Sequence, residues 1–254
     1  MAIINGETTD LQATRGLLLK NTLLSLCSFM AGTFVVALAI RVEMELGWSF
    51  VASAVASLAA IFAFVLYLLP FHPHRKFGYA NIVTAFRASL VSLTAAAVIS
   101  FESFHHVDAV LWVLVGGVAV ALALDGIDGY LARKYRQESQ LGARFDMEVD
   151  AYLILILSVA AAMLDKAGAW VLLVGLMRYG FVAIGWLLPS LQGELPPSMR
   201  RKVICVVQGV SLCFILMPWI DPPLSEIVAG LALGSLIFSF LVDAAYLLTS
   251  RVQE

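Results

Sequence analysis

Charged side chains are scarce in this chain of 254 residues. Asp, Glu, Lys and Arg make up 13% of the sequence, about half of the share that is typical of soluble domains. Cysteine is scarce too, and its three residues stand apart in apolar runs, which excludes a disulfide framework or a zinc site of ordinary spacing. No polar stretch is long enough for a second, soluble domain. With 61% hydrophobic residues and a mean hydropathy of +0.92, the sequence predicts an all-α, polytopic membrane helix bundle.

Hydrophobic runs that match the thickness of a bilayer make up most of the chain. A membrane helix needs about 20 mostly apolar residues. Polar residues ahead of the first run, among them Glu7 and Asp10, disfavour a cleaved signal peptide. Prolines mark several of the connections between runs. The eight predicted spans cover residues 17–40, 49–70, 81–101, 109–131, 145–164, 168–189, 203–219 and 226–249.

The loops between these spans alternate in charge. Basic residues cluster before the first span and after the second, fourth and sixth, whereas the other loops are acidic or nearly neutral. Positive loops stay on the cytoplasmic side of a membrane. The alternation therefore predicts that both termini and the connection between the fourth and fifth spans face the cytoplasm.

Four aspartates border this connection, in the segment DGIDGYLARKYRQESQLGARFDMEVD at residues 125–150. Asp125 and Asp128 are three residues apart, and Asp146 and Asp150 are four apart, so each pair shares one face of a helix. Carboxylates at membrane depth are costly unless a cation compensates them. Oxygen-only ligands suit Mg²⁺, Mn²⁺ or Ca²⁺. We therefore predict that the four aspartates bind a divalent metal.

Small residues and an arginine accompany the aspartates. Gly129, Ala132 and Gly142 suggest that a ligand or another helix approaches the backbone closely. Arg133 adds a cation beside the carboxylates, and metal with arginine next to carboxylates is a common way to hold phosphates. Taken singly, aspartates can cap helices and glycines can serve helix packing. Their combination at fixed intervals favours a phosphate site.

The complete pattern, D-x2-D-G-x2-A-R-x8-G-x3-D-x3-D, resembles the signature of the CDP-alcohol phosphotransferases, also called CDP-alcohol phosphatidyltransferases. The match has no substitution and no spacing error. The resemblance covers about residues 79–250 and implies the six-helix core of that family. We therefore expect an N-terminal segment with two added transmembrane helices at residues 1–78 and the family domain at residues 79–254. Family members are commonly homodimers, so a homodimer is an expectation for this chain.

The resemblance also implies roles for the motif. Family members transfer a phosphate-linked alcohol from a CDP-alcohol to a hydroxyl acceptor and release CMP. By motif position, the four aspartates would hold a pair of Mg²⁺ or Mn²⁺ ions, and Asp150 would also be the catalytic base for the acceptor hydroxyl. The nucleotide and diphosphate would lie against Gly129, Ala132, Arg133 and Gly142.

A second segment resembles the family motif Pro-Asn-x-x-Thr-x-x-Arg, with Ala80 in place of the proline. Asn81, Thr84 and Arg87 follow one another at three-residue steps on one helical face and would line the nucleotide pocket. Without the resemblance, Asn81 would be interpreted as a helix cap and Arg87 as a snorkelling side chain.

A third segment resembles Gly-Lys-x-x-Thr-x-x-Gln, with Arg201 in place of the glycine and Cys205 in place of the threonine. Arg200, Arg201 and Lys202 would bind the phosphate of an acceptor, although an ordinary positive-inside loop has the same composition. Arg178, within the sixth predicted span, is a better candidate because a buried arginine needs an anion.

These observations predict an integral membrane enzyme of phospholipid synthesis. It would transfer a phosphatidyl group from CDP-diacylglycerol to a small alcohol, with glycerol 3-phosphate and an inositol phosphate as the favoured acceptors. We expect membrane lipid as a partner and no nucleic acid. Two alternatives use the same aspartates. A cation transporter would carry ions through them, although transport sites usually lie near the bilayer midplane, and a membrane hydrolase of nucleotide–lipid pyrophosphates would use water as the acceptor.

Overall fold

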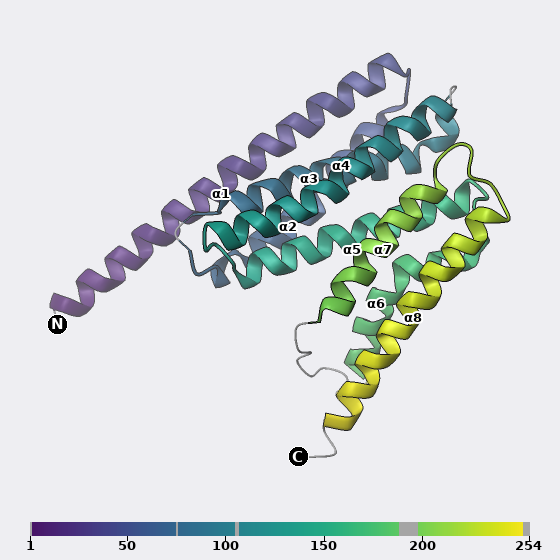
Figure 1. Ribbon diagram of the computed structural model, residues 1–254. Coiled ribbons are helices and arrows are strands. Elements are labelled where there is room, and N and C mark those ends of the chain that lie inside the picture. The colour runs from purple at the N-terminus through teal and green to yellow at the C-terminus, as the bar shows by residue number, and fades with distance from the viewer. Residues whose placement is uncertain (1, 75, 105–106, 188–197, 251–254) are drawn as a thin grey trace. The chain divides into compact units, whose positions relative to one another are not determined.

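The computed structural model describes residues 2–74, 76–104, 107–187 and 198–250, with side chains from Gly16 onward except at Leu248 and Ser250. In these residues every regular element is a helix, which confirms the predicted all-α bundle (Figure 1). The elements in order are α1 (Ala2–Glu43), α2 (Trp48–Leu68), η1 (Leu69–Phe71), α3 (Tyr79–Ile99), η2 (Phe101–Ser103), α4 (Val107–Lys134), α5 (Gln140–Met163), η3 (Ala169–Val171), α6 (Leu172–Leu187), α7 (Met199–Ile215) and α8 (Leu224–Ser250).

Each predicted span corresponds to one of these α-helices, and several helices are longer than the apolar run inside them. α4 continues to Lys134, and α5 already begins at Gln140. Because hydropathy marks only the part of a helix that crosses lipid, polar turns at helix ends escape it. Because α4 extends to Lys134 and α5 begins at Gln140, all four motif aspartates lie on helices.

Six helical segments of the described chain are long and apolar enough to cross a membrane, which establishes an integral membrane protein. They lie along α1, α2, α3, α4, α6 and α8. α7 has only 17 residues, and the first half of α5 carries Arg144, Asp146, Glu148 and Asp150. The count of eight spans and their orientation stay predictions.

The chain forms two compact units, and both α4 and α5 contribute to each of them. The first unit comprises residues 1–105 and 123–149, and the second comprises residues 106–122 and 150–254. The first unit therefore contains α1, α2 and α3 together with the end of α4 and the start of α5. The predicted domain boundary after residue 78 separates an added N-terminal segment from the family domain. This boundary stays a prediction.

In the first unit, α3 packs against both α1 and α2. The buried face of α3 is built from small side chains such as Ala85, Ala88 and Ala95, which allow close helix approach. Phe50 and Leu58 fill the corresponding face of α2. This close packing surrounds α3 so fully that its polar residues are buried as well, and some of them become part of the site described below.

In the second unit, α8 packs against α6 and α7, and polar contacts fasten the helices. The amide of Gln208 on α7 donates hydrogen bonds to the carbonyl of Ala232 (2.9 Å) and the hydroxyl of Ser235 (3.1 Å) on α8. The buried ammonium of Lys166, between α5 and α6, donates to the carbonyl of Ile220 (2.7 Å) and the carboxylate of Asp221 (2.8 Å). These contacts tie the connection after α5 to the loop before α8.

Candidate active site

Three of the four motif aspartates meet in the first unit. Asp125 and Asp128 lie on one face of α4, and Asp146 lies on the second turn of α5. One carboxylate oxygen from each lies within 4.8 Å of the other two. Asp128 is buried, whereas the side chains of Asp125 and Asp146 are 28% and 37% exposed. The three carboxylates, called the aspartate triad below, form a cluster that is open on one side.

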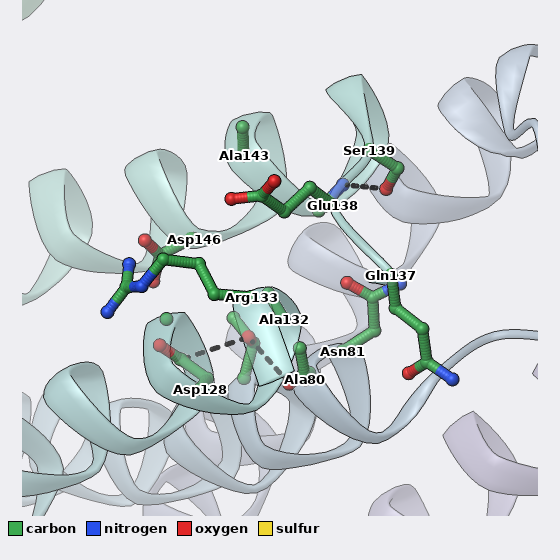
Figure 2. A pocket seen from close by; sticks show the side chains of 13 residues that line it. Ala80, Asn81, Asp128, Ala132, Arg133, Gln137, Glu138, Ser139, Ala143 and Asp146 are labelled. Atoms are coloured by element: carbon green, nitrogen blue, oxygen red, sulfur yellow. Dashed lines mark hydrogen bonds between the residues drawn. The ribbon is translucent and has the colours of Figure 1, made fainter. Parts of the chain in front are cut away.

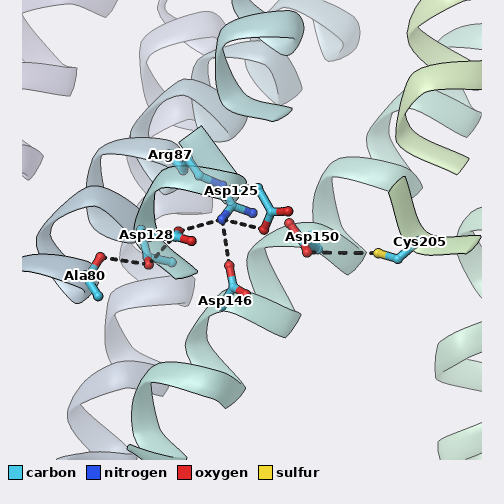
Figure 3. Close-up of polar contacts among 8 residues, drawn as sticks. Ala80, Arg87, Asp125, Asp128, Asp146, Asp150 and Cys205 are labelled. Atoms are coloured by element: carbon cyan, nitrogen blue, oxygen red, sulfur yellow. Dashed lines mark hydrogen bonds and ion pairs between the residues drawn. The ribbon is translucent and has the colours of Figure 1, made fainter. Parts of the chain in front are cut away.

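Arg87 of α3 supplies the positive charge of this cluster (Figure 3). Its Nη1 atom lies 3.0 Å from Asp125 Oδ1, 2.7 Å from Asp128 Oδ2 and 2.6 Å from Asp146 Oδ1. The arginine side chain is 1% exposed, so these ion pairs are shielded from water on the arginine side. The hydroxyl of Thr84, one turn earlier on α3, lies 3.1 Å from Asp128 Oδ2. The structure thus places two of the predicted nucleotide-binding residues, Thr84 and Arg87, against the aspartates.

Asn81, the third of these predicted residues, touches the start of α5. Its amide nitrogen donates to the carbonyl of Phe77, and its Oδ1 atom faces Gly142. A Cβ atom at position 142 would lie only 2.8 Å from Asn81 Oδ1 and 3.2 Å from Ser139 Oγ. The motif glycine is therefore required by a close approach between α3 and α5, and Ser139 accepts a hydrogen bond from the Gly142 amide at 3.0 Å as a cap of α5.

Gly129 has a different surrounding. A Cβ atom there would meet only the guanidinium of Arg133, at an ordinary contact distance of 3.5 Å. No neighbouring helix therefore comes close enough to require glycine at this position. The missing side chain instead widens the cavity beside the triad.

This cavity lies between the starts of α3 and α5 and the end of α4 (Figure 2). The triad forms part of its wall through Asp128 and Asp146. The cavity therefore offers carboxylates, a guanidinium, amides and backbone groups side by side. Its lining residues are Ala80, Asn81, Thr84, Asp128, Gly129, Ala132, Arg133, Gln137, Glu138, Ser139, Gly142, Ala143 and Asp146.

The turn between α4 and α5 is anchored to the start of α3. The backbone N–H of Tyr79 donates to Gln137 Oε1 at 3.0 Å. Gly78 has a φ of +92°, and a Cβ atom there would lie 3.1 Å from the same Gln137 oxygen. Both the left-handed backbone and the close approach favour glycine at this position. This contact fixes one wall of the cavity.

Asp150 follows Asp146 by four residues on α5 and belongs to the second unit. Its Oδ2 atom lies 4.0 Å from the thiol sulfur of Cys205 on α7 (Figure 3). Cys205 stands where the family motif has threonine. The thiol is a weak hydrogen-bond donor to this carboxylate. The roles of Asp150 as a metal ligand and as the catalytic base stay predictions.

The predicted acceptor-binding residues also lie in the second unit. Arg178 is half-buried on α6, Arg200 and Arg201 are half-buried at the start of α7, and Lys202 is exposed. Arg200 and Arg201 both contact Asp243 of α8, at 2.5 Å and 3.3 Å. Part of their charge is therefore already compensated within the protein.

Several contributors to the site escaped sequence reasoning. Asp243 lies in an apolar helix, where a carboxylate is rare enough to be a signal by itself. Ser139 stands just before α5, and a serine before a helix is a recognisable cap. Gln137 and Glu138 had no signal, because only the fold of the turn brings them to the cavity.

The triad fits a divalent cation. Its oxygens are hard ligands of the type that Mg²⁺ and Mn²⁺ prefer. They already converge on a single positively charged nitrogen, Arg87 Nη1, at 2.6–3.0 Å. The three carboxylates exceed the charge of that one guanidinium, which leaves the cluster with a charge of about −2 when all groups are ionised. Asp125, Asp128 and Asp146 are therefore able to hold such an ion.

A family model, CDP-alcohol phosphatidyltransferase, matches residues 77–241 of this chain. The match covers more than half of the sequence and contains the triad, the cavity and all three resembling segments. The chain belongs to the CDP-alcohol phosphatidyltransferase family, and it is therefore a transferase of that type, acting on a CDP-alcohol and an alcohol acceptor.

The chain is similar to a protein named probable phosphatidylglycerophosphate synthase from two strains of Mycobacterium tuberculosis, CDC 1551 and H37Rv. In each case 30% of the residues are identical over 145 aligned positions, which span 56% of this chain and 68% of the relative. No solved structure matches the chain significantly.

Proposed function

We propose that this chain transfers a phosphatidyl group from CDP-diacylglycerol to a hydroxyl group of glycerol 3-phosphate and releases CMP. The observation that carries the proposal is the aspartate triad in the wall of a cavity, within an unsubstituted family motif. The name of the mycobacterial relatives supports glycerol 3-phosphate over an inositol phosphate as the acceptor. The cationic residues of α6 and α7 support a phosphorylated acceptor over a neutral one.

The proposed chemistry is a direct transfer at phosphorus. Asp150 takes the proton of the acceptor hydroxyl as a general base. The acceptor oxygen forms a bond to the lipid-bearing phosphorus while the bond from that phosphorus to the bridging oxygen breaks, and CMP leaves with this oxygen. A pair of Mg²⁺ or Mn²⁺ ions, held by Asp125, Asp128, Asp146 and Asp150, would neutralise the diphosphate and stabilise the leaving CMP.

The remaining residues would orient the donor. Arg133 lies in the cavity wall beside Gly129, where its guanidinium is available to the diphosphate. Asn81, Ala132 and Gly142 would border the nucleotide. Thr84 and Arg87 hold the carboxylates of the triad.

The test of this proposal is CMP release by the purified protein from CDP-diacylglycerol with Mg²⁺ or Mn²⁺. Glycerol 3-phosphate, an inositol phosphate, glycerol and inositol are offered in turn as acceptors, and a water-soluble CDP-alcohol is offered as an alternative donor. We expect release that depends on glycerol 3-phosphate and is abolished by Asp128→Asn and Asp150→Asn. Asp165→Asn, an exposed position in the turn after α5, is the matched control and should retain activity.

Other results would contradict parts of the proposal. CMP release without any acceptor indicates a hydrolase. Release that depends on an inositol phosphate corrects the acceptor and leaves the reaction class intact. Absence of release from both donors, together with aspartate-dependent cation uptake into proteoliposomes, indicates a transporter.

The acceptor residues have a test of their own. Arg178→Gln and Arg201→Gln should each raise the KM for glycerol 3-phosphate about tenfold, because one charge-assisted hydrogen bond is worth about 1.5–3 kcal/mol. The KM for CDP-diacylglycerol should stay unchanged. An equal rise in both KM values would indicate a structural role instead.

We also propose eight transmembrane spans, with both termini and the site on the cytoplasmic side, and residues 1–78 as an addition to the family core. The charge alternation of the loops supports this orientation, and the start of the family match at residue 77 supports that division. Cysteine introduced at Gln137 should react with an impermeant maleimide only from the cytoplasmic side, and cysteine at Asp221 only from the opposite side. A homodimer remains the expectation for the assembly, and the mass of the purified protein in detergent tests it.

A further inference from the structure

Arg87 contacts the triad in an unusual way. Arginine commonly binds a carboxylate through two nitrogens in a parallel fork. Here a single nitrogen, Nη1, serves three carboxylates at 2.6, 2.7 and 3.0 Å. That nitrogen carries only two hydrogens, so at most two of the contacts are ordinary hydrogen bonds. The guanidinium therefore acts chiefly as a positive charge at the point where the three oxygens converge.

The same three carboxylates are the ones that would hold a divalent ion, since each offers a ligand oxygen within 4.8 Å of the other two. Their oxygens Asp125 Oδ1, Asp128 Oδ2 and Asp146 Oδ1 already lie 2.6–3.0 Å from Arg87 Nη1. A divalent ion and the guanidinium would therefore draw on the negative charge of one set of carboxylates, and each cation repels the other there. Arg87 and the ion compete for this charge.

The charges of the triad and the solvent exposure of its carboxylates indicate how the two cations reach it. Without Arg87, three carboxylates within 4.8 Å of one another would repel strongly at a partly buried site. Arg87 approaches from the buried side, whereas Asp125 and Asp146 remain 28% and 37% exposed. The residues that line the cavity include Asp128 and Asp146 and not Arg87, so an ion can reach these two carboxylates from the cavity.

We propose that Arg87 is a displaceable counter-ion, which neutralises the triad in the metal-free protein and gives up its central position when a divalent ion binds. This inference rests on the metal site of the proposed function. Arg87 is then a positioning residue that lowers the affinity for metal, because the free energy of its ion pairs has to be given up upon binding. In return, its ion pairs stabilise the metal-free protein.

The experiment measures Mn²⁺ binding to the protein in detergent by electron paramagnetic resonance, and thermal unfolding with chelator and with Mn²⁺. We expect Arg87→Met to bind Mn²⁺ about tenfold more tightly than the wild type, to unfold at lower temperature in chelator, and to gain more stability from Mn²⁺. Arg87→Lys retains a positive charge and should bind Mn²⁺ with nearly the wild-type affinity. Arg41→Met removes a cation that lies 4.1 Å over the ring of Trp48, away from the triad, and is the matched control.

The sign of the change decides the inference. Weaker or unchanged Mn²⁺ binding by Arg87→Met would overturn it, since Arg87 would then organise the ligands instead of competing with the ion. If Arg87→Met folds only with metal present, chelation will unfold it. An Arg87→Lys variant that stays folded under the same chelation supports the inference. Unfolding of both variants contradicts it.

Asp128→Asn separates this result from a failure of the proposed metal site. Mn²⁺ binding that is equal in wild type and Asp128→Asn, or absent from both, removes the metal site itself. Binding that is lost in Asp128→Asn and is no tighter in Arg87→Met removes only the role given to Arg87.

Discussion

Replacing Gly142 by alanine should lower the catalytic efficiency of the enzyme while the protein remains folded. The new Cβ atom would lie 2.8 Å from Asn81 Oδ1, whereas ordinary contacts begin near 3.4 Å, so the amide would have to retreat by about 0.6 Å. Asn81 is only 4% exposed and is held by its hydrogen bond to the Phe77 carbonyl. The retreat therefore strains a contact that shapes the cavity.

The expected change in the free energy of unfolding combines two opposing contributions. Overpacking costs about 1–3 kcal/mol, and the better helix propensity of alanine offsets about 1 kcal/mol. The free energy of unfolding should therefore fall by about 0–2 kcal/mol. Loss of one well-placed contact to the donor, about 1.4 kcal/mol, corresponds to a tenfold decrease in kcat/KM for CDP-diacylglycerol.

The assay is steady-state CMP release at varied CDP-diacylglycerol, with thermal unfolding in detergent measured beside it. Gly116→Ala is the control, because a Cβ atom there meets nothing within 4 Å. If the contact with Asn81 is the cause, Gly142→Ala should cost much less in an Asn81→Ala background. Additive effects of the two changes, or an unchanged kcat/KM in Gly142→Ala, would refute this reasoning.

Three further predictions concern stability and metal. Asp243→Asn should lower the free energy of unfolding by about 1–3 kcal/mol, since it leaves the half-buried Arg200 without its carboxylate; denaturation in detergent measures this, and an unchanged midpoint contradicts it. Lys166→Met should cost about 1–3 kcal/mol because the Ile220 carbonyl loses its donor, and the melting temperature should fall while CMP release at lower temperature persists. Chelation should abolish CMP release, with recovery upon addition of Mg²⁺ or Mn²⁺; activity that survives exhaustive chelation would exclude the metal site.

Local chemistry explains why much of the fold and of the site was predictable. Long apolar runs have to become helices in a bilayer, because only a helix satisfies its own backbone hydrogen bonds there. Asp125 and Asp128 share a face through helical periodicity alone. Asp146 joins them because a short polar turn returns the chain to the same end of the bundle. The grouping of the triad therefore follows from residues that are close along the chain.

Helix ends and the membrane role of α5 and α7 were less predictable. Hydropathy reports burial in lipid and not helix length, so the polar first turns of α5 were invisible to it. The same polar residues, Asp146 and Asp150 among them, keep α5 from meeting the criteria of an ordinary membrane span. A helix that carries active-site residues is more polar than one that faces lipid, so hydropathy alone does not mark it as a membrane span.

The sequence by itself determined the helical membrane architecture, the family and the shared helix face of Asp125 and Asp128, because hydropathy, motif spacing and helical periodicity are all properties of the linear chain. Only the tertiary structure decided that Arg87 serves the aspartates, that Asn81 needs Gly142 to be a glycine, and that Asp243 binds Arg200. These partners are distant in sequence and lie on different helices. These residues come into contact only when the helices pack. Burial and charge then determine which side chains pair.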